Sequence, residues 1–271
     1  SIMNLVNKMY LNLNKLIRIE DKKLIIRTQY KASYYIHITK EKINFYFIVP
    51  KPFYTKFRVK FKEIWKSVEI KEVDSIPLIS GSQYQLIYKN KDYMSTNADM
   101  RTNDLLAANM STVEVLQYGE EAGILYNFIP TSEKQCNYFK SSCQQFIREY
   151  KNNNVKYTSN TIVNIIIKIL TYSIDFINST LNTLFDVKQM DQQVNFSKLS
   201  NNTTKKANSD ICKTQIILST KAKTTAREKS IIDTITNSYG IVSDDNEFVC
   251  KKIKGNVRTL NASIYECGNF I

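Results

Sequence analysis

Two similar stretches, YFIVP at residues 46–50 and YNFIP at residues 126–130, decide the first interpretation of this 271-residue sequence. Each closes an apolar run, and each is followed by an amphipathic helical pattern. Because proline cannot donate to a sheet ladder, an apolar run that ends in proline and passes into a helix is typical of the end of a strand. The recurrence predicts one α+β unit whose two halves share an order of elements.

The residues around these stretches predict alternating strands and helices. Strand patterns fall at residues 43–50, 68–73, 83–88 and 123–130, and helical patterns at 52–66 and 97–116. The resulting order β-α-β-β-α-β is that of a ferredoxin-like unit. We therefore expect an α+β protein with a ferredoxin-like unit at residues 43–130, preceded by strands near 23–30 and 33–39.

Four segments are expected along the chain. They are an amphipathic N-terminal helix at 1–20, a ferredoxin-like α+β domain at 21–130, a helical segment with a polar linker at 131–210, and a partial, truncated second α+β module at 211–271. Helical patterns are also expected at 132–150 in the third segment and at 224–240 in the fourth. The N-terminal helix fits docking on its own domain or lying on a membrane surface.

Residues 161–186 are the most apolar stretch, but a narrow polar stripe that includes Lys168 and Asp175 runs along them. Charges near the middle of the stretch disfavour a free-standing transmembrane span. We expect a helix that buries most of its surface against a protein partner, its own domain or a membrane.

The basic excess of the chain is concentrated near its N-terminus. The formal net charge is +13, and residues 1–60 alone hold 13 Lys/Arg against 3 Asp/Glu. The candidate contacts to an anionic surface are Lys51, Lys56, Arg58, Lys60, Lys62 and Lys66. Such a block suits phospholipid headgroups or nucleic acid, and it also suits a solvated face without a partner.

No pattern in the sequence predicts an active site. Neither a GxxxxGK[ST] phosphate loop nor a GxGxxG motif occurs. The chain has five cysteines, no CxxC motif and a single histidine, His37, so a zinc site is not expected. Cys136 and Cys143 are predicted to be buried free thiols. The carboxylates of Asp244–Glu247 are more typical of a solvated turn than of metal or acid–base chemistry. We predict no catalytic residue, cofactor, metal or small-molecule substrate.

Several phrases resemble a known family. They lie in residues 42–76, 80–130, 214–253 and 263–271, and include KINFYFIVPKPF, LIYKNKDYMSTNADMRTND and TQIILSTKAKTTAREKS. They resemble the region that precedes the motor domain in conjugation and type IV secretion ATPases of the HerA–FtsK superfamily. The resemblance implies a non-catalytic accessory region of a bacterial DNA-translocation ATPase, cytoplasmic or at the inner face of the cell membrane. ATP and magnesium are implied only for a motor domain, whose motifs are not among these residues.

Two other hypotheses stay open. One is a stand-alone basic nucleic-acid-binding α+β protein, because ferredoxin-like sheets can present aromatic rings for base stacking and Tyr46, Tyr88 and Tyr126 lie in predicted strands. The other is an enzyme that uses the carboxylates of Asp244–Glu247. The expected partners are further copies of the chain or other subunits of a secretion channel, with an anionic membrane surface and DNA as further candidates.

Overall fold

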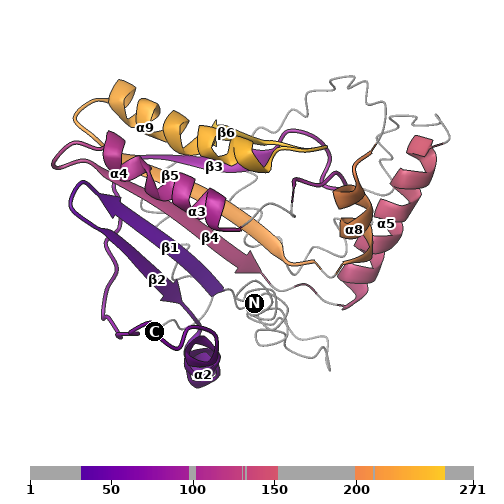
Figure 1. The fold of residues 1–271 in the computed structure, drawn as a ribbon, viewed down its shortest axis with the longest axis horizontal. Helices are drawn as coiled ribbons and strands as arrows, with labels where there is room; N and C mark the ends of the chain where they lie inside the picture. The colour runs from indigo at the N-terminus through magenta and orange to yellow at the C-terminus, as the bar shows by residue number, and fades with distance from the viewer. Residues whose placement is uncertain are drawn as a thin grey trace.

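Six antiparallel strands form one sheet in the computed structural model, which describes residues 32–97, 102–129, 131, 133–151, 199–209 and 211–253. The strands are β1 (Ala32–Thr39), β2 (Ile43–Ile48), β3 (Ser82–Tyr88), β4 (Glu121–Ile129), β5 (Lys213–Lys221) and β6 (Phe248–Lys252). Across the sheet they lie in the order β2-β1-β4-β5-β3-β6 (Figure 1). The expected α+β class is confirmed.

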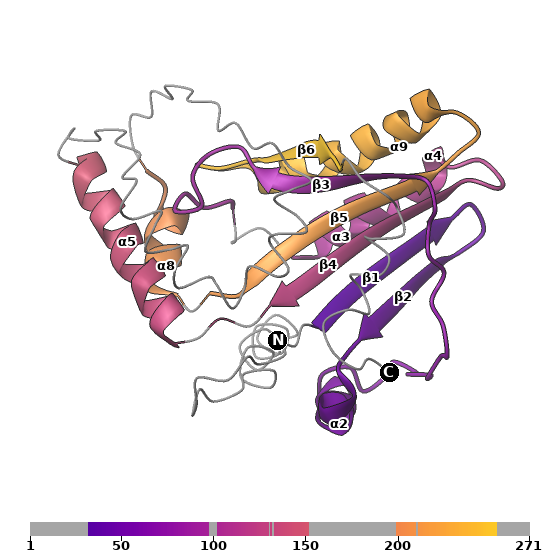
Figure 2. The same cartoon turned by 180° about the vertical axis from the view of Figure 1, so that it is seen from behind.

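Helices gather on one face of this sheet. Over its centre lie α3 (Thr102–Met110), α4 (Thr112–Val115) and α9 (Thr225–Ser238), and α2 (Tyr54–Ile64) packs where β1, β2 and β4 have a common end (Figure 1). A separate pair, α5 (Glu133–Lys151) and α8 (Asn201–Asn208), lies beside one end of the sheet (Figures 1 and 2). Short 3-10 helices, η1 (Lys51–Phe53) and η2 (Tyr239–Val242), precede α2 and follow α9.

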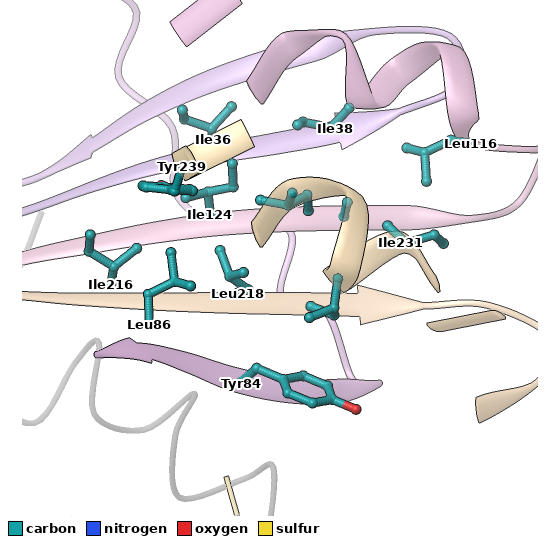
Figure 3. Close-up of a cluster of buried hydrophobic side chains, with 13 residues drawn as sticks. Ile36, Ile38, Tyr84, Leu86, Leu116, Ile124, Ile216, Leu218, Ile231 and Tyr239 are labelled. Carbon is teal, nitrogen blue, oxygen red and sulfur yellow. The ribbon is translucent and has the colours of Figure 1, made fainter. Parts of the chain in front are cut away.

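The largest apolar cluster fills the space between the sheet and α9 (Figure 3). Its buried members include Ile36 and Ile38 of β1, Leu86 of β3, Ile124 of β4, Leu218 of β5, and Ile231, Ile232 and Ile235 of α9. Alternate residues of each strand face this cluster, because successive side chains of a strand point to opposite faces of the sheet. One core therefore joins strands from both ends of the described chain.

The β-α-β-β-α-β order expected at residues 43–130 is not formed there. Residues 68–73, expected as a strand, are exposed and form no strand, and β5 lies between β4 and β3. The order β-α-β-β-α-β is instead followed by β3, α3, β4, β5, α9 and β6, whose strands lie side by side as β4-β5-β3-β6. A strand needs a ladder partner to form, and both partners of β3, as well as one of the two partners of β4, come from the segment that the sequence assigned to a second module.

The strands of the predicted domains at 21–130 and 211–271 thus belong to one sheet. The helix predicted at 132–150 is confirmed as α5, and the long helix predicted at 97–116 is α3 and α4 within the described residues. The helices predicted at 1–20 and 161–186 lie outside the described residues. Among the residues that are described, no helix has the length and apolar character needed to cross a membrane.

Candidate functional site

Helix α2 is held to the sheet by an aromatic inner side. Phe57 is buried against Ala32, Val49 and Phe128. The ring of Phe61 lies edge-on to that of Phe47 of β2, with centroids 4.3 Å apart. Aromatic pairs of this kind contribute about 0.5–1.5 kcal/mol beyond their buried area. Because this side packs against strands, the orientation of the helix is fixed and its opposite side faces outward.

The outward side carries the basic residues that the sequence singled out. The α2 basic surface consists of Lys51, Lys56, Arg58, Lys60, Lys62 and Lys66, of which Lys60 is half-buried and the others are exposed. Lys60 Nζ lies 2.6 Å from Glu63 Oε2, and Arg58 Nη1 lies 3.9 Å from Glu72 Oε1. Among the described residues, no carboxylate lies within 4.0 Å of the other four side chains. The structure therefore gathers the predicted contacts on α2 and directly beside it, in η1 and after the helix end, and within the described part of the chain four of the lysines have no carboxylate partner.

An exposed apolar side chain lies among these cations. Val59 is 52 % exposed and follows Arg58 on the outer side of α2. Sequence reasoning missed this residue, although its position in the helical pattern, two residues after the buried Phe57, places it on the outer side. The α2 basic surface is thus a mixed basic and apolar surface.

His37 takes part in a cluster that joins three strands. Its Nε2 lies 3.0 Å from Glu121 Oε2, and Lys221 Nζ lies 3.1 Å from Glu121 Oε1. Burial alone would raise the pKa of Glu121, but hydrogen bonds to His37 and Lys221 outweigh it and lower this pKa. The arrangement links β1, β4 and β5, which is the structural use expected of a buried strand histidine.

The carboxylates of Asp244–Glu247 attach α8 to the sheet. Asp245 is buried, and its Oδ2 accepts hydrogen bonds from the Ser200 backbone N–H at 2.8 Å and from Thr203 Oγ1 at 2.5 Å. Asp244 Oδ2 accepts one from Asn202 Nδ2 at 2.9 Å. Within the described residues, no group of three or more His, Cys, Asp or Glu side chains could hold a metal ion. These carboxylates are therefore occupied by contacts within the fold.

The tyrosines considered for base stacking do not share a surface. Tyr126 donates to or accepts from the hydroxyl of Tyr239 in the core, with the two oxygens 2.5 Å apart. Tyr88 stacks on Phe248 with centroids 4.9 Å apart, on the helix-covered face of the sheet. Tyr46 instead stacks on a β1 tyrosine on the opposite face. A row of aromatic rings on one open sheet face, as base stacking requires, is not formed by these residues.

The prediction for the two α5 cysteines is confirmed. Cys136 and Cys143 are buried free thiols on the helix. Burial raises the pKa of Cys143 to about 11, so its thiol is protonated at neutral pH and is a poor nucleophile.

No protein-family model, curated protein or solved structure matches this chain. The α2 basic surface is the candidate functional site on its geometry and charge.

Proposed function

We propose that this chain is a non-catalytic docking region whose α2 basic surface binds anionic phospholipid headgroups. In this proposal it is an accessory region of a conjugative or type IV secretion DNA-translocation ATPase, lies at the inner face of the cell membrane, and contacts other subunits or the membrane channel. One observation carries the proposal: α2 packs its aromatic side on the sheet, and four exposed lysines on it or directly beside it have no carboxylate partner among the described residues. The link to translocation ATPases is supported by the sequence phrases.

The electrostatics of α2 suit a lipid surface. A Lys or Arg near an anionic leaflet contributes about 1 kcal/mol of attraction, and the effect fades within a Debye length. Residues 51–66 hold six basic residues and one acidic residue, Glu63. The exposed Val59 can enter the boundary between headgroups and acyl chains while the lysines stay at headgroup level.

Nucleic acid is the second candidate, because phosphates of a duplex attract the same lysines. The structure favours lipid for two reasons. Tyr88 and Tyr126 are packed within the fold instead of being presented to bases. In addition, an exposed valine among the cations contributes to insertion between lipids and adds little to a phosphate contact.

Sedimentation with vesicles tests the proposal. We expect the chain to pellet with vesicles of phosphatidylglycerol and phosphatidylcholine and to stay in solution with phosphatidylcholine alone. The variant K56E/K62E should weaken binding at least about 30-fold, since two lysines contribute about 2 kcal/mol. The matched control is K134E/K223E, which changes the net charge equally at exposed lysines of α5 and of the loop before α9. It should bind nearly as the parent chain does.

Two results would overturn the proposal. One is an equal loss of binding in both variants, which would mean that only net charge matters. The other is absence of vesicle binding together with salt-dependent binding to a DNA duplex that K56E/K62E removes, which would assign the α2 basic surface to nucleic acid.

A further inference from the structure

We propose that the edge strand β2 pairs with residues 68–73 of a second copy of this chain, which add to the sheet as a further strand. The inference names the surface for the subunit contacts that are part of the proposed function. It rests on that function in no other way, because it uses backbone groups and apolar side chains and none of the α2 lysines.

The first observation concerns β2. It is at the end of the sheet and, among the described strands, pairs only with β1. Natural edge strands are protected by charged residues, proline or bulges. The six residues Ile43–Ile48 contain no charged residue and no proline, and Phe45 is 47 % exposed. Such an edge is a template for a strand from another chain.

The second observation concerns residues 68–73, which follow α2. Their sequence, VEIKEV, begins with alternating apolar and charged residues and is rich in β-branched side chains, as strands are. Yet Val68, Ile70 and Val73 are 56 %, 39 % and 49 % exposed, and the segment joins no strand in the structure. A single exposed valine is ordinary, but three large apolar side chains within six residues indicate a surface that is covered in an assembly.

The segment is held away from its own sheet at its start. The backbone N–H of Val68 donates to the carbonyl of Trp65 at 3.2 Å, and Glu72 lies beside Arg58 of α2. From there the chain passes β2 on its way to β3 (Figure 2). It forms no ladder with its own β2, so within the residues that the structure describes both pairing surfaces are open to a second copy.

The two surfaces complement each other in length, chemistry and symmetry. Both are six residues long, and each has apolar, β-branched or aromatic side chains that can pack across a ladder, while backbone hydrogen bonds supply affinity when a strand adds to an edge. Glu69 and Glu72 outnumber Lys71 within the segment, and exposed Lys42 lies directly before β2. Because each copy donates one segment and accepts another, a two-fold pair closes with the β2 edge of both copies paired.

Sedimentation equilibrium of the full chain tests this inference. We expect a monomer–dimer equilibrium whose dissociation constant rises about tenfold or more in F45K and in I70K, since each variant removes a large apolar group from the interface. The control Y118K makes the same kind of change at an exposed tyrosine in the loop before β4 and should dimerise normally. Circular dichroism and the melting temperature verify that each variant is folded.

Cross-linking tests whether residues 68–73 of one chain contact β2 of the other chain. An equal mixture of ¹⁴N- and ¹⁵N-labelled chains, treated with a lysine-reactive cross-linker, should give mixed-isotope links between Lys71 and Lys42. K56E/K62E should keep both the dimer and this link, which separates a failure of lipid binding from a failure of dimerisation. The inference is overturned by a chain that stays monomeric, by a dimer that F45K and I70K leave intact, or by Lys71–Lys42 links that join only chains of one isotope.

Discussion

Replacing Asp245 with alanine should destabilise the protein by about 3 kcal/mol. The carboxylate is buried, and it accepts hydrogen bonds from the Ser200 backbone N–H at 2.8 Å and from the Thr203 hydroxyl at 2.5 Å. Ser200 is the N-cap of α8, so Asp245 joins the first turn of that helix to the segment before β6. Alanine would leave two donors of this turn without their acceptor.

The magnitude follows from the number and kind of bonds. A hydrogen bond to a charged group contributes about 1.5–3 kcal/mol, so the two bonds together contribute about 3–6 kcal/mol. Thr203 is fully buried, but Ser200 is only half-buried, so water can replace part of what its N–H loses. The expected loss of stability in D245A therefore lies at the lower end of this range, about 3 kcal/mol. Asp244 is exposed and accepts a single bond from Asn202, and its replacement by alanine should cost about 0.5–1 kcal/mol.

Urea unfolding followed by far-UV circular dichroism measures both variants. With an m-value of about 3 kcal/mol/M, D245A should unfold at a urea concentration about 1 M lower than the parent chain, and D244A within about 0.3 M of it. Amide hydrogen exchange should also become faster in Asn201–Asn208 of D245A. Equal midpoints for the two variants, with unchanged exchange in α8, would refute the idea that this carboxylate docks the helix.

Three further predictions concern charge, thiol chemistry and backbone packing. A hydrogen bond from Arg227 lowers the pKa of Glu120 in the folded protein. The Glu120 carboxylate therefore stabilises the fold at pH values above the ordinary glutamate pKa, and this stabilisation is lost as the pH falls through the lowered pKa of the folded state. In thermal unfolding, E120Q should therefore melt at a lower temperature than the parent chain at pH 7, and this difference in melting temperature should disappear well below about pH 4. A difference that does not change with pH would contradict this. With a pKa of about 11, Cys143 should react with iodoacetamide at pH 8 only in denaturant, as peptide mass mapping can show; fast labelling of the native chain would disagree. Finally, G81A should destabilise far more than G240A in chemical unfolding, because a Cβ at Gly81 would lie 1.8 Å from a backbone carbonyl of β5, whereas one at Gly240 meets nothing within 4 Å.

Local patterns in the sequence predicted most elements to within a few residues. The strands expected at 33–39, 83–88 and 123–130 match β1, β3 and β4, and the helices expected at 132–150 and 224–240 match α5 and α9. Hydrophobic periodicity reports which side of an element is buried, and this depends on neighbours in sequence. It does not report which strands pair. The place of β5 between β4 and β3 joins segments far apart in the chain, and no local signal specifies it.

In the candidate site, too, the local features could be predicted from the sequence and the contacts between distant segments could not. The cluster of six basic residues on and directly beside α2 could be predicted, because charge and helical spacing are both local properties. The pairing of Arg58 with Glu72 could not, since Glu72 lies beyond the end of α2 in a segment whose course depends on the fold. The role of Asp245 was equally hidden, because its partners Ser200 and Thr203 belong to a helix reached through a distant part of the sequence.

The repeated phrase shows why similar sequence need not mean equivalent structure. The strands β2 and β4 flank β1 and are both antiparallel to it, so they run in the same direction and end at the same end of the sheet. This shared exit accounts for the common order of strand, proline and helix.

The registers of these two strands, however, differ by one residue. Tyr46 lies opposite Tyr35 of β1, whereas Tyr126 lies opposite Tyr34. Because side chains alternate between the faces of a sheet, this shift sends Tyr126 into the core with Tyr239 and Tyr46 to the other face. The two similar stretches therefore reflect strands that run in the same direction and end at the same end of the sheet, while their matching tyrosines have different structural roles.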